Sequence, residues 1–136
     1  MYLLDTNVLS ELRRRQRTNP KVAAWADGVD PADLFLSAIT ILEIEAGMLL
    51  IARRDQAQGA LLHSWIENRV LPAFHGRILP VDTAVAQLCA RLHVPDPRAE
   101  RDALIGATAL VHRLKLVTRN TKDFSPMGVA LVNPWA

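Results

Sequence analysis

Four acidic side chains lie where no structural requirement clearly places them. Asp5 ends an apolar run at the amino terminus, and Glu43 lies inside one of the most hydrophobic stretches of the chain. Asp102 opens an apolar helical segment, and Asp123 follows an apolar segment of strand-like composition. Charges beside buried segments are costly unless something compensates them, and a divalent cation is the natural compensation. The four residues therefore indicate a metal site and hydrolytic chemistry.

Length and charge narrow the class of protein. The 136 residues suffice for one domain, residues 1–136, with a sizeable core, because half of them are hydrophobic. The net charge is only +2, but thirteen of the sixteen basic residues are arginine. The planar guanidinium group suits phosphate oxygens, so the composition favours an anionic partner.

The single cysteine, Cys89, excludes a disulfide scaffold, a zinc site and a CxxC redox pair. Its apolar helical context is typical of a small core residue. No leader with a cleavage site is evident, and no apolar run reaches the length of about 18 residues that a membrane span needs. We therefore expect a cytoplasmic protein without membrane association.

Short apolar segments alternate with helical patterns along the chain. Five segments have the composition of buried strands: residues 1–5, 34–37, 77–81, 114–118 and 129–132. Helices are expected over residues 6–15, from 20, over 40–54, 55–71 and 82–93, and from about 98–102. Pro72 and Gly76 are expected to bracket a loop. The alternation predicts an α/β domain with a central parallel sheet of about four or five strands and helices on both faces.

This topology can bring the acidic residues together. The carboxyl ends of parallel strands form the ligand crevice of an open sheet, and Asp5 and Asp123 follow two such strands. Glu43 and Asp102 are expected near helix N-termini that face the same edge. At about 5 Å and an effective dielectric of about 20, each pair of carboxylates repels by about 3 kcal/mol, which a cation would offset. All-oxygen ligands favour Mg²⁺ or Mn²⁺ over zinc or copper.

Each acidic residue also has a simpler explanation. Asp5 can cap the helix that follows it, and Asp102 can complement a helix dipole. The pattern Thr40-x-x-Glu43 has the form of a capping box, in which the glutamate bonds to the cap amide. Asp123 can be a turn residue. The metal-site prediction therefore depends on the joint pattern of all four.

Four short motifs occur in order along the chain: Leu4-Asp5-Thr6-Asn7, Thr40-x-x-Glu43-x-x-x-Gly47, Asp102-Ala103-Leu104-Ile105-Gly106-Ala107-Thr108-Ala109, and Thr118-Arg119-Asn120-x-x-Asp123-Phe124. With these motifs at this spacing, the chain resembles the PIN-domain ribonucleases over essentially its whole length. It is most similar to the VapC toxins of bacterial toxin–antitoxin pairs, especially the FitB-like branch. The closing Val132-Asn133-Pro134-Trp135 also resembles that branch.

The resemblance implies an acidic metal site built from Asp5, Glu43 and Asp102. At the position where the family usually has its fourth acidic residue, this chain has Asn120. Asn120 can ligate through its carbonyl oxygen or hold a metal-bound water, and Asp123 can supply the missing charge instead. The fourth ligand is thus either of these two residues.

The resemblance also implies an activity. Thr6 and Thr118 look like the family's hydroxyl residues that orient the carboxylates or metal-bound waters, and Arg119 beside them is a candidate phosphate contact. We expect a Mg²⁺-dependent (or Mn²⁺-dependent) endoribonuclease toxin, in which a metal-activated water attacks the RNA phosphodiester and leaves 5′-phosphate and 3′-hydroxyl ends. No histidine base is required, and no histidine lies in a motif.

The expected partners, besides RNA, are a cognate antitoxin and a second copy of the chain, together forming a toxin–antitoxin hetero-oligomer. The helices expected over residues 40–71 are apolar on more than one face, so dimerisation or antitoxin docking is expected to cover the excess. A cluster of arginines can contact RNA phosphates or an acidic antitoxin segment, or it is a solvated helix end that the helix dipole favours. This cluster consists of Arg13, Arg14, Arg15 and Arg17.

The main alternative is a non-catalytic PIN-like module that binds RNA or a partner, which Asn120 in place of an acid keeps open. A response-regulator receiver needs an acidic pair after the first strand, where Asp5 stands alone. A haloacid-dehalogenase-type phosphatase needs Asp-x-Asp, and the chain has Asn7 at the second of these positions. Both of these enzyme-like classes are disfavoured.

Overall fold

The computed structural model describes residues 1–14 and 16–136, so Arg15 of the predicted arginine cluster lies outside the described residues. Within these ranges, five parallel strands form one sheet in the order β3-β2-β1-β4-β5. The strands are β1 (Tyr2–Leu4), β2 (Leu34–Ser37), β3 (Ile78–Leu79), β4 (Lys115–Val117) and β5 (Leu131–Val132). The predicted α/β class and the parallel sheet are confirmed.

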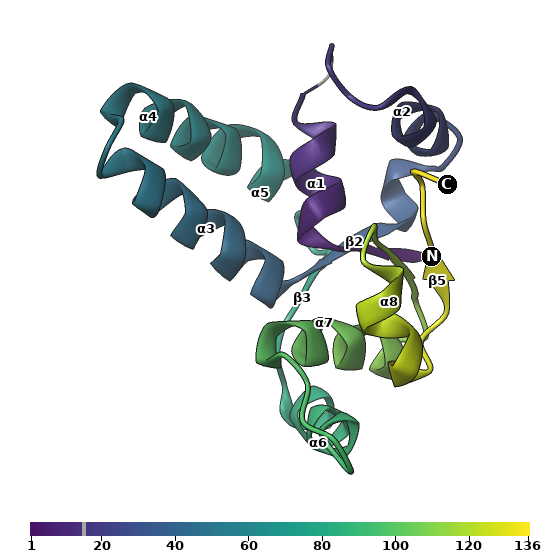
Figure 1. The fold of residues 1–136 in the computed structure, drawn as a ribbon. Coiled ribbons are helices and arrows are strands. Elements are labelled where there is room, and N and C mark those ends of the chain that lie inside the picture. Colours follow the sequence, from purple (N-terminus) through teal and green to yellow (C-terminus); the bar gives the residue numbers. More distant parts are fainter. Residues whose placement is uncertain (15) are drawn as a thin grey trace.

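Helices connect successive strands and cover both faces of the sheet. They are α1 (Thr6–Leu12), α2 (Pro20–Asp27), α3 (Ala38–Ala52), α4 (Gln56–Trp65), α5 (Leu71–Ala73), α6 (Thr83–Leu92), α7 (Glu100–Val111) and α8 (Thr121–Phe124). Shorter turns are the 3₁₀ segments η1 (Pro31–Asp33) and η3 (Ser125–Met127) and the π-helical segment η2 (Ile66–Val70). Figure 1 shows α1 and the α3–α4 hairpin on one side of the sheet, with α7 and then α6 on the other.

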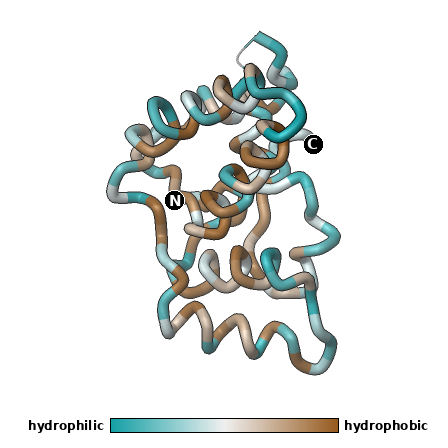
Figure 2. Tube along the Cα trace, turned by 90° about the vertical axis from the view of Figure 1, so that its left-hand side faces the viewer, coloured by the Kyte–Doolittle hydropathy of each residue, from teal (hydrophilic) through white to brown (hydrophobic). Residues whose placement is uncertain are grey.

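Alternating side chains of the strands divide the core into two halves. Leu4 and Val117 pack with residues of α1, α3 and η2, whereas Leu3 and Leu116 pack with residues of α7, α8 and η3. A third cluster holds α6 against the outer side of α7. Figure 2 shows apolar and hydrophilic residues alternating along the helices, as expected for helices with one buried face.

Helix α3 begins two residues earlier than the sequence pattern suggested. Ser37, the last residue of β2, is its N-cap, and the Oγ of Ser37 accepts a hydrogen bond of 3.0 Å from the N–H of Ile39. Thr40 therefore lies inside the helix, fully buried, and cannot act as the cap. The capping-box explanation for Glu43 is wrong, because Glu43 lies in the second turn of the helix.

The chain stays helical through Pro72, where a loop was predicted. The segment η2 is a π-helical turn, and the N–H of Leu71 bonds to the carbonyl of Ile66, five residues earlier. A proline lacks an N–H and clashes with the carbonyl four residues before it. The wider π-helical turn admits Pro72 into α5, so the helix ends only at Ala73.

Exposed leucines concentrate on the α3–α4 hairpin, as the apolar excess of residues 40–71 predicted. The exposed large side chains there are Leu42, Leu49, Leu50 and Leu61. Within the described part of the chain, no helix has both the length and the apolar character needed to cross a membrane.

Candidate metal centre

The central strands bring residues from the first and last parts of the chain together at the carboxyl ends of the sheet. β1 and β4 are parallel neighbours, so the residues that follow them, Asp5 and Thr118, lie side by side. The Oγ1 of Thr118 donates a hydrogen bond of 2.7 Å to Oδ2 of Asp5. Oδ1 of Asp5 accepts a bond of 2.8 Å from the N–H of Thr6, so Asp5 also caps α1 as the simpler explanation proposed. Capping and a place in the acidic cluster coexist.

The hydroxyl group of Thr6 attaches the third helix to this edge. Its Oγ1 donates a hydrogen bond of 2.7 Å to Oε1 of Glu43 and lies 3.3 Å from Oγ1 of Thr40. Both threonines predicted to orient carboxylates thus contact one each: Thr118 contacts Asp5, and Thr6 contacts Glu43.

Asp102 lies in the first turn of α7, which has no side-chain cap. The pKa of Asp102 is raised, mainly by burial and further by the negative charges of Asp5, Asp123 and Glu43. The pKa of Asp5 is also raised, mainly by burial, with Glu43 adding to the rise and the hydrogen bonds from Thr118 and Thr6 opposing it. The four predicted acidic residues therefore share one region of negative potential.

The two candidates for the fourth ligand differ in their surroundings. Asn120 is the N-cap residue of α8, but its side chain makes no cap hydrogen bond, and its N–H donates to Oγ1 of Thr118 at 2.9 Å. Asp123 lies one turn further on and acts on the pKa of Asp102. Both side chains are exposed. The electrostatic coupling to Asp102 favours Asp123.

The donor set fits a hard divalent cation. Every acidic candidate offers carboxylate oxygens, which suit Mg²⁺ or Mn²⁺. The pKa values of Asp5 and Asp102 are raised mainly by burial and further by neighbouring carboxylates, and a cation would offset both effects. Among the described residues, however, the oxygens of these acids do not gather within 4.8 Å of one another. Ligation by all of them requires the side chains to close further.

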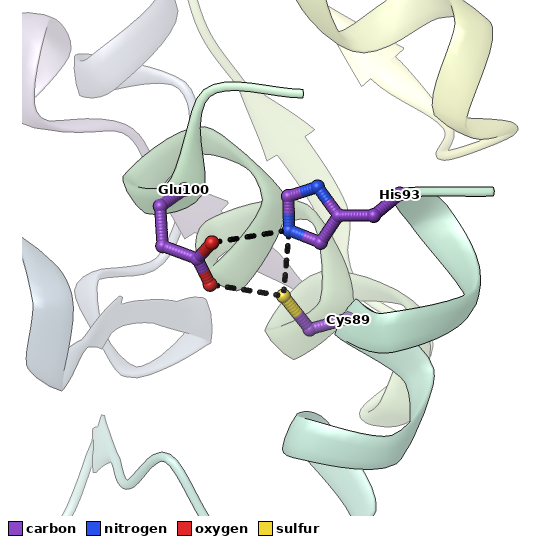
Figure 3. A group of neighbouring side chains, drawn as sticks. All are labelled: Cys89, His93 and Glu100. Atoms are coloured by element: carbon purple, nitrogen blue, oxygen red, sulfur yellow. Dashed lines mark hydrogen bonds and ion pairs between the residues drawn. The ribbon is translucent and has the colours of Figure 1, made fainter. Parts of the chain in front are cut away.

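A separate trio of possible metal ligands lies between α6 and α7 (Figure 3). The Sγ of Cys89 is 3.8 Å from Nε2 of His93 and 3.9 Å from Oε1 of Glu100, and Nε2 of His93 is 3.3 Å from Oε2 of Glu100. Cys89 is buried, as predicted for a small core residue, but the sequence did not predict its contacts with His93 and Glu100. Burial and the charge of Glu100 raise the pKa of the Cys89 thiol, which keeps it protonated.

The tautomer of His93 argues against a metal in this trio. Its Nδ1 accepts a hydrogen bond of 3.0 Å from the N–H of Arg98, so the neutral ring carries its proton on Nε2. That proton points at Glu100, and a metal on Nε2 would need a lone pair there. The trio is therefore a hydrogen-bonded clasp between the end of α6 and the start of α7.

Asp5, Glu43, Asp102 and Asp123 lie together at the carboxyl ends of the strands, and we call this region the acidic edge. Two arginines are connected to it by contact or by sequence. Arg101, which sequence reasoning missed although it directly precedes Asp102, places a guanidinium nitrogen 4.0 Å from Oε2 of Glu43. The predicted phosphate contact Arg119 stacks its guanidinium over the ring of Trp135, 5.3 Å from the ring centre. The backbone N–H of Arg119 donates to Oδ1 of Asn7 at 3.4 Å. Arg101 thus brings positive charge beside the acidic cluster, whereas Arg119 follows Thr118 and contacts Trp135.

A large cleft among the described residues lies away from the acidic edge. A cleft of about 870 Å³ lies between α1 and the α4–η2 segment, where Arg13, Arg14 and Arg17 of the predicted cluster meet Trp65. The guanidinium of Arg13 lies over the Trp65 ring at 5.8 Å. A smaller pocket of about 300 Å³ includes Asp102 and Asp123 in its wall. The described lining of the larger cleft contains no carboxylate, whereas the smaller pocket contains two.

Comparison with known proteins agrees with this geometry. The pattern of the PIN domain matches residues 2–128. Over 140 residues, the chain is 41% identical to Toxin FitB of Neisseria gonorrhoeae, with 99% of each chain covered. It is 35% identical over 140 residues to VapC ribonuclease Y4jK of Sinorhizobium fredii, covering 99% of this chain and 98% of that relative. The crystal structure of FitAcB from Neisseria gonorrhoeae superimposes with a TM-score of 0.90 at 40% identity, covering 99% of both chains.

A match over nearly the whole length, on a parallel sheet with an acidic edge, defines the class: the chain belongs to the PIN-domain family. Within that family, relatives that align along the entire chain place it in the group of FitB and VapC toxins. The family resemblance predicted from the four motifs is thereby confirmed.

Proposed function

We propose that this chain is the toxin of a toxin–antitoxin pair and acts as a Mg²⁺-dependent or Mn²⁺-dependent endoribonuclease. The observation that carries the proposal is the coupling of Asp102 to Asp5, Glu43 and Asp123 at one edge of the sheet. A fold that only needed stability would not gather three carboxylates around the half-buried carboxylate of Asp102. The names of the relatives FitB, a toxin, and Y4jK, a VapC ribonuclease, support the same activity.

The residues of the chain have distinct tasks in this activity. Asp5, Glu43 and Asp102 hold the cation, with Asp123 or Asn120 beside them. A bound Mg²⁺ would supply the positive charge that stabilises the negative charge on the phosphate oxygens in the transition state and would lower the pKa of a nearby water. Water oxygen then bonds to phosphorus, the bond from phosphorus to the 3′ oxygen breaks, and that oxygen takes up a proton. The products carry a 5′-phosphate and a 3′-hydroxyl.

Two hydroxyl groups keep the carboxylates ready for ligation. A carboxylate must be ionised to bind a cation, yet burial raises the pKa of Asp5. The hydrogen bond from Thr118 opposes that rise and fixes the orientation of Asp5. Thr6 fixes the orientation of Glu43 through its own hydrogen bond, and Arg101 and Arg119 are candidates to contact the RNA phosphates.

Two surfaces outside the acidic edge suit the proposed partners. The cleft that combines Arg13, Arg14 and Arg17 with Trp65 suits an acidic, partly apolar segment of a cognate antitoxin. The exposed leucines of the α3–α4 hairpin suit a second copy of the chain, giving a homodimer within a toxin–antitoxin hetero-oligomer. We place this assembly in the cytoplasm, where its RNA substrate is found.

The test is RNA cleavage by the full chain with matched variants. Structured RNA is incubated with Mg²⁺, with Mn²⁺ and with EDTA, using the wild type, Asp5→Asn, Glu43→Gln and Asp102→Asn. The exposed Asp27, remote from the acidic edge, supplies the control Asp27→Asn. We expect chelation and each of the three site variants to lower cleavage by at least about a hundredfold, and the control to cleave normally.

Two outcomes contradict the proposal. Cleavage that persists in EDTA or in Asp102→Asn overturns the metal centre. RNA binding by the wild type without any cleavage, in either metal, supports the non-catalytic PIN-like module instead. Sensitivity of the new RNA ends to a 5′-monophosphate-dependent exonuclease checks the predicted 5′-phosphate.

A further inference from the structure

The smaller pocket shares a wall with the acidic centre. It opens between the first turn of α7 and the segment formed by α8 and η3, and Asp102 and Asp123 belong to its lining. Its volume of about 300 Å³ lies at the lower end of the range for small-molecule sites. A single nucleotide fits this size, whereas a double helix does not.

Two cations distinguish the pocket from a purely acidic surface. Arg98 and Lys122 line it together with the two carboxylates. Arg98 is half-buried and held in place, because its Nε donates a hydrogen bond of 2.9 Å to the carbonyl of Leu92. An anion near Asp102 and Asp123 needs such positive charge to offset their repulsion.

The hydrogen-bonded clasp fixes the wall that carries Arg98. The N–H of Arg98 donates to His93, and His93 in turn bonds Glu100 at the start of α7. Figure 3 shows His93 and Glu100 meeting from the ends of two helices. The segment between them is thereby held at both ends, so the position of Arg98 is set in advance of any ligand.

The lining of the pocket also includes apolar side chains. Met127, which is 6% exposed, and Pro126 belong to η3 and line the pocket on the same segment as Lys122 and Asp123. The pocket therefore combines apolar contacts that suit a ribose or a base with cations that suit a phosphate group. A nucleotide carries both kinds of group.

We propose that the pocket is the subsite for the nucleotide on the 3′ side of the cut, with Arg98 and Lys122 contacting its phosphate. The inference rests on the proposed function, in which the 5′-phosphate stays on this nucleotide. Cleavage converts a phosphodiester with one negative charge into a monoester with about 1.5 to 2. Because the 5′-phosphate gains negative charge on cleavage, the positive charges of Arg98 and Lys122 would stabilise the nucleotide that carries it.

The test is a titration followed on methionine methyl groups. The chain has three methionines: Met127 lines the pocket, Met48 lies in the opposite half of the core, and Met1 is exposed. The full chain, labelled with ¹³C at its methionine methyl groups, is titrated with adenosine 5′-monophosphate in Mg²⁺, and adenosine 3′-monophosphate is the matched probe. The Met127 signal is assigned with Met127→Leu.

We expect adenosine 5′-monophosphate to shift the Met127 methyl signal in a saturable manner and to leave Met48 unchanged. Lys122→Ala and Arg98→Ala should each weaken this binding by about tenfold, the loss typical of a charged hydrogen bond to phosphate. Lys21→Ala, at an exposed lysine of α2, should bind as the wild type does. Unchanged Met48 and Met1 signals in the variants show that they fold.

Three results overturn the subsite. They are a Met127 signal that does not move, equal affinity for the 3′-monophosphate, and unchanged affinity in both Lys122→Ala and Arg98→Ala. The titration involves no RNA cleavage, so it can fail while the nuclease proposal holds. A chain that binds the 5′-monophosphate but never cleaves RNA would keep the pocket and lose the nuclease.

Discussion

Thr118 and Asp5 are 113 residues apart in the chain, yet the hydroxyl oxygen of Thr118 lies 2.7 Å from Oδ2 of Asp5. Both residues are buried. The hydrogen bond favours the ionised carboxylate and opposes the burial that raises the pKa of Asp5. Because only the ionised form binds a cation, Thr118 would favour cation binding at the proposed metal centre without being a ligand itself.

Thr118→Val should therefore shift the pH dependence of the enzyme. Valine keeps the shape of threonine but removes the hydroxyl, so the pKa of Asp5 rises further. We expect the acidic limb of the pH–rate profile for RNA cleavage to move to higher pH, with weaker Mn²⁺ binding at a fixed pH below it. Thr108→Val is the matched control, because buried Thr108 bonds only to Leu104 within α7. An acidic limb that stays in place would refute this role.

Asp102→Asn should stabilise the metal-free protein at neutral pH. The pKa of Asp102 in the folded chain lies above its ordinary value of 3.8, so the folded chain binds this proton more tightly than the unfolded chain. The stability that the group contributes is thus fully present below pH 3.8 and is lost as the pH rises through the raised pKa. Thermal unfolding in EDTA should give a higher Tm for the variant at pH 7 than for the wild type, and a smaller gain on adding Mg²⁺. A lower Tm for the variant in EDTA at pH 7 contradicts the expectation.

The fourth ligand can be settled by comparing Asp123→Ala with Asn120→Ala. Asp123 acts on the pKa of Asp102, whereas the side chain of Asn120 makes no cap hydrogen bond to α8. We expect Asp123→Ala to weaken Mn²⁺ binding by about tenfold and Asn120→Ala to change it little. Isothermal titration without RNA measures both. The reverse order would assign the position to Asn120, and no change in either would leave three acids sufficient.

Two glycines of the α3–α4 hairpin should respond oppositely to alanine. A Cβ at Gly59 would lie 2.5 Å from Cβ and 2.7 Å from Cα of Ala52, so the two helices would have to separate. A Cβ at Gly47, inside α3, meets nothing within 4 Å. Urea unfolding should show Gly59→Ala destabilised by about 2 kcal/mol, and Gly47→Ala stabilised by about 1 kcal/mol through helix propensity. Equal effects of the two substitutions would contradict the close approach at Gly59.

Gly106→Ala should displace Met127, which lines the proposed nucleotide pocket. A Cβ at Gly106 would lie 2.6 Å from Sδ of Met127, and the flexible methionine must move to relieve the contact. We expect a displaced Met127 methyl signal, weaker binding of adenosine 5′-monophosphate and a loss of about 1 kcal/mol in unfolding free energy. An unshifted Met127 signal in this variant would show that the side chain does not sit against Gly106.

The sequence pattern was sufficient to predict the α/β fold and the proximity of the four acidic residues. Short apolar segments alternate with capped helices, and such alternation has few solutions other than a covered parallel sheet. Because strand ends meet at one edge of that sheet, Asp5 and the residues after β4 had to be neighbours. The family motifs then separated Glu43 and Asp102 from the other acids of the chain.

What the pattern missed depends on contacts between distant residues. Ser37 and Thr40 are both competent caps, and the burial of Thr40 against the sheet decides between them. Pro72 signals a helix end unless a π-helical turn precedes it, which no local pattern reveals. The pocket wall at Arg98 is set by His93, five residues earlier, and by its clasp with Glu100.

The strand order β3-β2-β1-β4-β5 also sets the timing of assembly. Among the five strands, β1 is synthesised first and occupies the middle of the sheet, and one of its two partners, β4, is synthesised only after β2 and β3. A nascent chain therefore carries Asp5 long before Thr118 and Asp123 exist to complete the acidic edge. The acidic edge can therefore form only after β4 and α8 have been synthesised and β4 has paired with β1.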